Sequence, residues 1–258
     1  NMPKLPHIAL IATLGAMSTA LAYQYSEIQS LKGQPRQSQA ISEHKVVALV
    51  DQRLEVLERR RAKDGFEKKV FEFELAQQST PDHRLIYGNP EARITLQEFG
   101  DIECPFCRKM HDDLKQVVDN AENTVNWEFK HFPLESHNPA AALQAKVIEC
   151  VKDSYGNRVA WAALDRFIFE TAGNGKGVGD LTNFVRGMGL SGVAIDLCMA
   201  SDAHENRIES DYREGQALGI TGTPALRIID TQTGDAYLIK GYKTAEQIAQ
   251  AVQHILRG

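Results

Sequence analysis

The chain has 258 residues, 43% of them hydrophobic, and its 29 Lys and Arg against 34 Asp and Glu give a formal net charge of −5. This length allows one large domain or one domain with an appendage, and the composition is that of an ordinary globular protein. The mild negative charge and the lack of a long basic run argue against a nucleic-acid partner. Four cysteines are too few for a disulfide-dense mini-protein.

An uncharged segment, residues 8–26, lies near the N-terminus. Its apolar centre is short, and Ala20-Leu21-Ala22 has the small-x-small form that signal peptidases recognise. We therefore predict a cleaved export signal over residues 1–25. The alternative is an uncleaved anchor through residues 8–26, which are just numerous enough to cross a bilayer. Both interpretations place the rest of the chain outside the cytoplasm, where disulfides persist.

Residues 26–80 are predicted to form a helical linker and oligomerisation region. Residues 31–40 are polar, with Gly and Pro, and indicate a linker. The helix after the linker has apolar residues at three-four-three spacing, which places them on one face: Val47, Val50, Leu54 and Leu57. This face either packs on the chain's own domain or forms a seam with a second copy of the chain. We favour the seam, as a homodimer.

Two further signals are expected to end this region. Asp64-Gly65 is predicted to break the helix, because glycine is a poor helix former. A second segment over residues 66–75 follows, and Pro81 closes the region. A catalytic domain is therefore predicted over residues 81–258.

This second region alternates between β-rich and helical patterns. Strands are predicted over residues 93–99, 126–132, 225–229 and 236–239. Helices are predicted over residues 104–118, from Asn138 with Pro139 at the first helical position, and around Trp161 to Ile168. Two short helices are predicted after the capping residues Asp180 and Ser191. The last two helices are predicted from an Asp202–Glu205 capping box to Leu218 and from Thr244 to Leu256. This order predicts an α/β sheet with a helical insertion over about residues 134–219.

The sequence Cys104-Pro105-Phe106-Cys107 lies between a predicted strand and the start of a helix. The unpaired N–H groups and partial positive charge of a helix start stabilise a thiolate, so the pKa of Cys104 is expected below the free value of about 8.5. Cys107, one turn further on, is expected to be more buried and closer to an ordinary thiol. One nucleophile and one resolving thiol form the pair that thiol–disulfide exchange needs.

A zinc site and an inert structural disulfide are the alternatives for this pair. Zinc needs two more ligands at close spacing, whereas Cys150 and Cys198 are single and far apart in the sequence. We therefore predict no metal, and no cofactor other than the redox-active disulfide of Cys104 and Cys107. Cys150 and Cys198 lie on apolar helix faces of the insertion and are predicted to form a structural disulfide, with two separate buried thiols as the alternative.

Three stretches resemble the DsbA-like thioredoxin-fold thiol–disulfide oxidoreductases of bacterial envelopes: ITLQEFGDIECPFCRKMHDDL, FKHFPLESHNPAA and GQALGITGTPAL. The resemblance covers about residues 85–256 and implies a thioredoxin fold with a helical insertion, preceded by an N-terminal helical stalk. The pairing of a Cys-x-x-Cys helix start with a distal Gly-Thr-Pro is specific to thioredoxin folds. Residues before Pro81 are similar only in kind to the oligomerisation stalks of the DsbC, DsbG and ScsC proteins.

The resemblance implies a role for each matching residue. Cys104 matches the surface nucleophile, Cys107 the resolving thiol, and Thr223-Pro224 the loop whose cis-proline lies beside the active site and exposes backbone to a substrate strand. Glu98 matches a buried acid that can accept the Cys107 proton. The alternatives are an ordinary turn at Thr223-Pro224 and a surface glutamate on an edge strand at position 98.

Several residues depart from the pattern of DsbA-type oxidases. Phe106 stands where these enzymes usually carry His, so Pro105 and Phe106 are expected to modulate the site, with less stabilisation of the thiolate. Asp101 and Glu103 are expected to oppose the thiolate with negative charge. Cys-Pro-Phe-Cys is nearer the Cys-Pro-Tyr-Cys of DsbG-like proteins, and a threonine before the proline likewise resembles the isomerases more than DsbA.

These likenesses imply a periplasmic enzyme that acts on unfolded or misoxidised exported proteins and works with a membrane redox partner. We favour a disulfide isomerase or reductase, because of the stalk, Phe106 and Thr223. A DsbA-type dithiol oxidase is the first alternative. A chaperone-like binding protein with a vestigial thiol site is the second.

Overall fold

The structure is a computed structural model that describes residues 22, 25–27, 29 and 43–257. Most of the predicted export signal or anchor, and all of the predicted linker over residues 31–40, lie outside the described residues. The chain divides into two units, residues 1–53 and 54–258. Among the helices of the described ranges, none combines the length and the apolar character that crossing a membrane requires.

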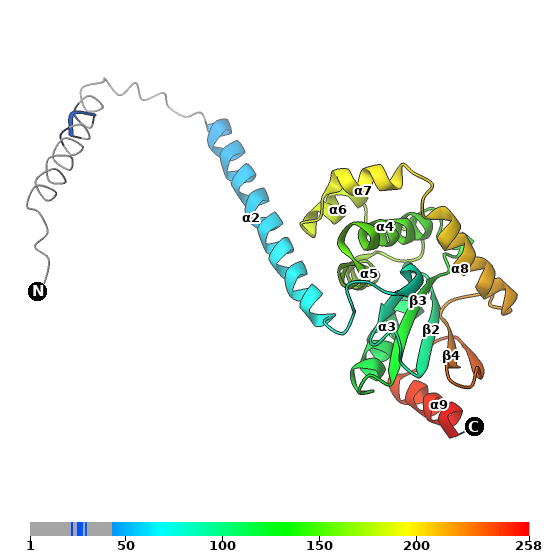
Figure 1. Ribbon diagram of the computed structural model, residues 1–258. Coiled ribbons are helices and arrows are strands. Elements are labelled where there is room, and N and C mark those ends of the chain that lie inside the picture. The colour runs from blue at the N-terminus through cyan, green and yellow to red at the C-terminus, as the bar shows by residue number, and fades with distance from the viewer. Residues whose placement is uncertain (1–21, 23–24, 28, 30–42, 258) are drawn as a thin grey trace, which may run out of the picture. The chain divides into compact units, whose positions relative to one another are not determined.

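Helix α2 runs from Glu43 to Glu72 without interruption (Figure 1). The prediction that Asp64-Gly65 breaks the helix is therefore wrong. An interior glycine costs a helix only about 1 kcal/mol relative to alanine, whereas burying one phenylalanine contributes roughly 1.5–3 kcal/mol. Phe66 and Phe73 are both buried just after the glycine, so tertiary packing outweighs the local propensity.

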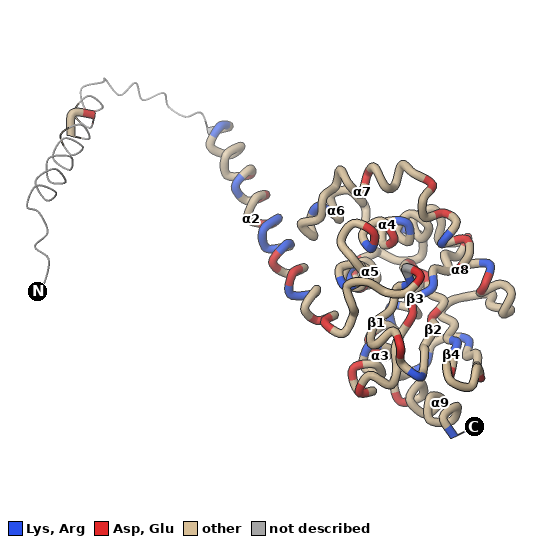
Figure 2. The backbone as a smooth tube through the Cα atoms, viewed as in Figure 1, with Lys and Arg blue, Asp and Glu red and all other residues tan. Residues whose placement is uncertain are grey.

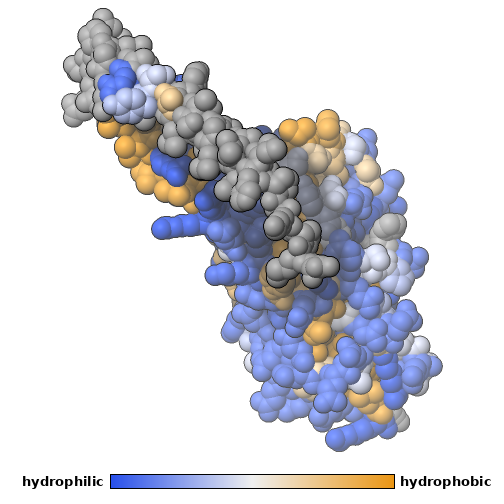
Figure 3. Space-filling model, turned by 60° about the vertical axis from the view of Figure 1, so that its left-hand side comes forward, coloured by the Kyte–Doolittle hydropathy of each residue, from blue (hydrophilic) through white to orange (hydrophobic). Residues whose placement is uncertain are grey.

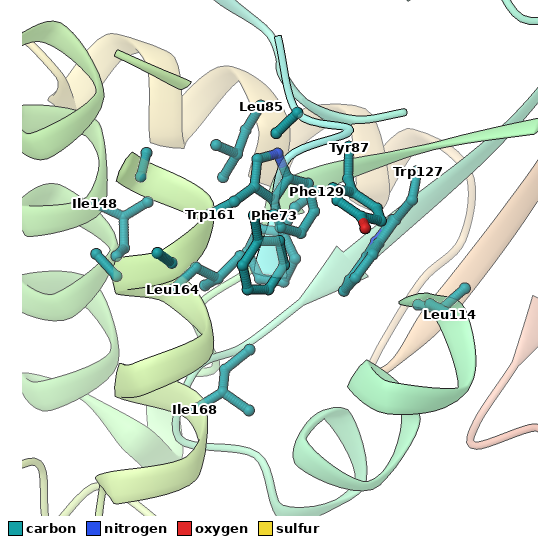
Figure 4. Close-up of a cluster of buried hydrophobic side chains, with 14 of the residues drawn as sticks. Phe73, Leu85, Tyr87, Leu114, Trp127, Phe129, Ile148, Trp161, Leu164 and Ile168 are labelled. Atoms are coloured by element: carbon teal, nitrogen blue, oxygen red, sulfur yellow. The ribbon is translucent and has the colours of Figure 1, made fainter. Parts of the chain in front are cut away.

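The C-terminal part of α2 belongs to the core of the second unit. Phe73, in the turn after α2, packs against Tyr87 and Trp161 with ring centroids 5.3 and 6.1 Å away (Figure 4). Lys69 Nζ lies 3.1 Å from the carboxylate of Asp165 on α5 (Asn157–Glu170). The packed unit therefore begins well before the predicted domain boundary at residue 81.

A five-stranded sheet forms the centre of this unit, in the order β1-β3-β2-β4-β5. The strands are β1 (Leu85–Tyr87), β2 (Ile94–Gly100), β3 (Val125–His131), β4 (Ala225–Asp230) and β5 (Ala236–Lys240). β2 and β3 are parallel, and the other neighbours pair antiparallel. All seven residues of β2 are buried, as expected of the middle strand of a covered sheet. The sequence did not predict β1, because three residues are too few to show an alternation.

Helices cover both faces of this sheet. α3 (Pro105–Asp119) and α9 (Ala245–Arg257) pack on each other and on one face, and α8 (Glu205–Ala217) contacts β2 and β3. Leu96 belongs to the main core with residues of α3, whereas Phe99 belongs to a smaller cluster with Tyr212 of α8. Because side chains alternate along a strand, Glu98 shares the α3 face with Leu96.

The insertion between β3 and β4 holds α4 (Ala140–Tyr155), α5, α6 (Leu181–Gly187), α7 (Gly192–Met199) and α8. The predicted α/β thioredoxin fold with a helical insertion is thus confirmed; single 3₁₀ turns cover Pro81–His83 and Glu135–His137. A disulfide joins Cys150 on α4 to Cys198 on α7, 48 positions apart. In the chain-entropy model, closing a loop of that length stabilises the fold by about 4 kcal/mol.

Three helices begin at their predicted capping residues. Asp180 and Ser191 each accept a hydrogen bond from the backbone N–H three residues on. Thr244 and Gln247 exchange hydrogen bonds at the start of α9, which makes a capping box. These local signals therefore placed the starts of α6, α7 and α9 correctly.

Two predicted helix starts are wrong. α8 begins at Glu205 with His204 before it and no side-chain cap, because the Asp202 carbonyl accepts the Glu205 N–H in a turn outside the helix. α4 begins at Ala140, one residue after the predicted start, since Pro139 occupies the capping position itself.

Candidate functional site

The two free cysteines lie at the start of α3, one turn apart. Cys104 is the N-cap residue, in extended backbone conformation, and Cys107 lies inside the first turn with no exposed surface. The backbone N–H of Asp101 donates to Cys107 Sγ at 3.4 Å. The neighbouring side chain of Phe106 is 61% exposed. Cys104 is itself only 4% exposed, so it is not the surface residue that the resemblance implied. The pair has an outer sulfur at the helix start and an inner sulfur one turn further on.

The loop between α8 and β4 closes over the outer sulfur. The Thr223–Pro224 peptide bond is cis, and the Thr223 carbonyl oxygen lies 3.4 Å from Cys104 Sγ, across 119 positions of sequence. Pro224 is buried and directly precedes β4. The alternative of an ordinary turn does not account for this contact, because the structure places the cis peptide bond against Cys104.

The two thiols have opposite pKa shifts. The pKa of Cys104 is lowered to about 6, first because the Cys107 thiol donates to it, and further by the Thr223 side chain and the N–H groups of Cys107 and Phe106, against the opposing effect of burial. The pKa of Cys107 is raised well above that of a free thiol, first by burial, then by its hydrogen bond to Cys104, and further by the charges of Glu98 and Cys104. At neutral pH, Cys104 is therefore the nucleophile and Cys107 holds the proton.

We expect Cys104 in the reduced protein to titrate with a midpoint near 6. A folded-state pKa below the unfolded value stabilises the reduced fold at pH values above the unfolded pKa, and this stabilisation is lost as pH falls through about 6. Thiolate absorbance against pH measures the midpoint, and Cys104→Ala should remove the transition. A midpoint near 8 in the wild-type protein would contradict the stabilisation of the thiolate at the helix start.

Glu98 lies in the middle of the central strand and is 1% exposed. The alternative of a surface glutamate on an edge strand is therefore wrong. The Trp127 indole N–H donates to Glu98 Oε2 at 3.1 Å. Burial raises the pKa of Glu98 to about 8, the Trp127 hydrogen bond lowers it, and the charge of Cys104 raises it further. A carboxyl whose charge acts on the pKa of the Cys107 thiol can take up its proton through water.

Gly100 makes room for this acid. A Cβ at position 100 would lie 2.5 Å from the ring of Phe129 and 3.1 Å from Glu98 Oε1. Real Cβ atoms do not approach a ring so closely, so any larger residue displaces Phe129 or the carboxyl. The glycine at the end of β2 is thus a packing requirement of the site.

Asp101 and Glu103 do not act as the sequence suggested. Asp101 accepts hydrogen bonds from the backbone N–H groups of Glu103 and Leu134 and lies 2.8 Å from His137 Nδ1. Neither carboxylate is among the main influences on the pKa of Cys104. Asp101 instead joins the active-site turn to the segment after β3.

Glu103 holds a glycine-rich loop, residues 173–179, in the same way. Its carboxylate accepts hydrogen bonds from Gln144 Nε2 at 2.7 Å, from the Gly177 N–H at 3.0 Å and from the Thr171 hydroxyl. Its carbonyl accepts the Asn174 N–H at 2.8 Å. This loop is therefore held by hydrogen bonds to the residue directly before the nucleophile.

The predicted seam residues lie on α2, away from the cysteine pair in sequence. Val47, Val50, Leu54 and Leu57 are between 41% and 52% exposed. Their apolar surface is thus available, as Figure 3 shows in orange along the first part of α2.

One group among the described residues has metal-ligand character: Cys150, Cys198 and His204. Its two sulfurs are joined as a disulfide, so neither is the thiolate that binds zinc. No metal role follows from this group.

Sequence reasoning missed Trp127. The stretch Asn126 to Phe132 predicts a strand, but nothing in it says which residue of β2 lies opposite. The parallel pairing sets Trp127 beside Leu96 and Phe129 beside Glu98, and only that register reveals the partner of the buried acid.

Comparison with known proteins is consistent with this geometry. A family model described as Thioredoxin matches residues 79–253. The chain is similar to the crystal structure of DsbA2 from Pseudomonas aeruginosa, with 31% identity, 66% of this chain and 92% of that chain covered, and a TM-score of 0.60. BdbD from Bacillus subtilis shares the fold, with 19% identity, 71% and 98% coverage and a TM-score of 0.55.

Curated relatives match over only part of their length. The Na(+)/H(+) antiporter NhaA 1 of Mycolicibacterium gilvum is 24% identical over 158 residues, which are 57% of this chain and 23% of that protein. The thiol:disulfide interchange protein DsbC of Salmonella typhimurium is 24% identical over 164 residues, which are 64% and 52% of the two chains. The chain thus spans about a quarter of the antiporter and about half of DsbC.

Proposed function

Since the chain belongs to the thioredoxin family and has a DsbA-like fold, we propose that it is a protein thiol–disulfide oxidoreductase that acts on exported proteins through Cys104 and Cys107. The observation that carries this proposal is the asymmetry of the pair. The outer thiol has a pKa of about 6, and the inner thiol keeps its proton beneath it.

The reaction begins with the Cys104 thiolate. It attacks one sulfur of a substrate disulfide, so a Cys104–substrate bond forms, the substrate S–S bond breaks and one substrate thiolate leaves. Cys107 then attacks Cys104 and releases the second substrate thiolate, which leaves the substrate reduced and the enzyme oxidised. In isomerisation a substrate thiol takes the place of Cys107, and the enzyme is released reduced. Thr223 supplies backbone beside the sulfur for an extended substrate segment.

Within this class we favour a disulfide isomerase or reductase. Phe106 offers no side-chain donor to the thiolate, threonine precedes the cis-proline, and α2 carries an exposed apolar stripe. A homodimer through that stripe would set two Cys104 sites on one client. The DsbA-type oxidase is the alternative, and the likeness to P. aeruginosa DsbA2 favours it. A chaperone-like protein with a vestigial thiol site is a third candidate, against which the complete set of site residues argues.

The setting we propose follows from the same reaction. The enzyme works in the periplasm on unfolded or misoxidised exported proteins, with a membrane redox partner and no cofactor beyond its own cysteine pair. A membrane anchor or a cleaved signal serves this location equally, since both deliver residues 43–257 to the same side.

Two parallel assays test the assignment. The reduced protein is incubated with scrambled ribonuclease, and the oxidised protein with reduced ribonuclease, and recovered ribonuclease activity is followed in both. An isomerase accelerates the first reaction more than the second. Greater acceleration of the second identifies an oxidase, and no acceleration of either, together with no reduction of insulin, removes the enzyme proposal.

A further inference from the structure

Two tryptophans lie side by side in the core, and one of them binds the buried acid. Trp127 on β3 and Trp161 on α5 are both fully buried, with ring centroids 4.5 Å apart (Figure 4). The Trp127 indole N–H donates to Glu98 Oε2 at 3.1 Å and is the only hydrogen-bond donor to that carboxyl among the described residues. The buried indole nitrogen of Trp161 has no hydrogen-bond partner among the described residues.

We infer that Trp127 is a positioning residue for the resolving step: its indole N–H orients the Glu98 carboxyl and stabilises its charged form, so that it can take the proton of Cys107. The inference rests on the proposed function, since it concerns the release of the mixed disulfide. Trp127 itself does not touch the reacting sulfurs and acts only through Glu98.

The packing around Trp127 fixes the direction of its N–H. The indole packs against Trp161 and lies at 72° to the plane of the His111 ring, whose centroid is 4.8 Å away. A fully buried ring in such a setting has no alternative rotamer without repacking the core. The acid therefore meets a donor at a fixed position.

An indole N–H suits this task because it only donates. It can bond to a carboxylate but cannot accept a hydrogen bond from the neutral acid, so it favours the charged form. A buried carboxylate without any donor would stay protonated, and a cationic donor would hold it ionised at all working pH values. A neutral donor leaves Glu98 able to gain and lose a proton during each turnover.

The step is balanced as follows. The Cys107 thiol loses its proton to the Glu98 carboxylate, and the resulting thiolate attacks Cys104 Sγ in the mixed disulfide. The Cys104–Cys107 bond forms, the Cys104–substrate bond breaks, and the substrate leaves as a thiolate. The enzyme pair is oxidised and the substrate sulfur is reduced.

The electrostatics agree with this geometry. Burial raises the pKa of Glu98 to about 8 and the Trp127 hydrogen bond lowers it. The charge of Cys104 raises the pKa of Glu98, and the charge of Glu98 raises that of Cys107. His111 on α3 is a further titratable side chain that packs against the Trp127 ring. Removing the N–H should therefore raise the pKa of Glu98 further.

The test compares Trp127→Phe with Trp161→Phe. Both variants replace a fully buried indole by a smaller ring in the same cluster, but only the first removes a donor from Glu98. The reduced proteins react with excess oxidised glutathione over a range of pH values, and acid-quenched samples are resolved by mass spectrometry, so that tryptophan fluorescence is not needed. The rate of conversion of the glutathione mixed disulfide to the Cys104–Cys107 disulfide is the readout. Carbon-13 NMR of labelled glutamate, assigned with Glu98→Gln, follows the carboxyl directly.

A hydrogen bond to a charged group is worth about one to two pH units of titration. We therefore expect the Glu98 midpoint and the inflection of the resolving rate to move upward by about that amount in Trp127→Phe. At pH values below the inflection, the resolving rate should fall about tenfold for each pH unit, because the charged fraction of Glu98 falls by that factor. Trp161→Phe should keep the wild-type midpoint and a resolving rate within about twofold, and Glu98→Gln should abolish the inflection.

Equal pH profiles for the two tryptophan variants would overturn the inference. If the wild-type protein forms no mixed disulfide at all, the proposed function fails instead. The NMR midpoint of Glu98 still decides the role of Trp127 in that case, since an unchanged midpoint in folded Trp127→Phe overturns it without any turnover.

Discussion

Cys104→Ala is expected to reduce thiol–disulfide exchange to the rate measured without protein, whereas Cys107→Ala should keep the first attack and accumulate a mixed disulfide. With a pKa of about 6, about nine-tenths of Cys104 is thiolate at pH 7, so its loss removes the only reactive sulfur of the pair. Cys107 is fully buried and protonated and cannot replace it. Insulin reduction measures the first variant, and mass spectrometry of the trapped adduct measures the second.

The matched control is the double variant Cys150→Ala/Cys198→Ala. It also removes two sulfurs, but from the disulfide between α4 and α7, and should retain exchange activity wherever it stays folded. The adduct formed by Cys107→Ala should form more slowly as pH falls and the Cys104 thiolate is protonated, with a midpoint above that of the wild-type protein, because the variant lacks the Cys107 thiol that lowers the pKa of Cys104. An adduct on Cys107 in the Cys104→Ala protein would reverse the assignment of nucleophile and resolving thiol.

Removing the first part of α2 is expected to separate isomerisation from simple exchange. The cut is placed after Glu58, which removes the whole stripe but keeps the buried residues Phe66 and Phe73. A cut at Pro81 would remove these two core residues and unfold the catalytic unit. The chain from Arg59 onward should be a monomer that reduces insulin at the wild-type rate. Its recovery of scrambled ribonuclease should fall to roughly a tenth, if the proposed dimer holds one client between two sites.

A point variant tests the same surface with the helix intact. Each half-exposed apolar side chain of the stripe can bury enough surface in a dimer to contribute about 1 kcal/mol, so Val50→Glu combined with Leu54→Glu should disrupt the dimer. The control is Gln52→Glu with Arg59→Glu, which the helical repeat places on the side of α2 opposite the stripe. Charged residues of both signs are frequent along this helix (Figure 2). Light scattering reports the mass of each protein. A wild-type monomer at micromolar concentration would remove the dimer, and with it most of the preference for isomerase over oxidase.

Local signals in the sequence predicted the parts of the site that lie close together along the chain. Cys104, Pro105 and Cys107 form one short motif at a helix start, and the strand before it has a clear alternation. Thr223-Pro224 was found only through the resemblance, because no local property connects it to a sulfur 119 positions away. The structure places it at that sulfur, so its role depends on tertiary contact.

Other features could not be predicted because they depend on register or on packing energies. The partner of Glu98 follows from how β3 aligns with β2, and a shift of one residue would turn Trp127 to the opposite face. The charges of Asp101 and Glu103 were visible, but not the buried donors that occupy them. The end of the helix at Gly65 was predicted from propensity, which the burial of Phe66 overrides.

The disulfide between α4 and α7 has to be formed by oxidation while the protein itself folds. Cys150 has no exposed surface in the folded chain, so an oxidant has to reach it while the insertion is still open. Forming this disulfide removes two protons and two electrons from the two thiols, so it needs a two-electron oxidant. The yield of fully oxidised protein should therefore depend on the thiol-oxidising capacity of the surroundings in which the chain folds.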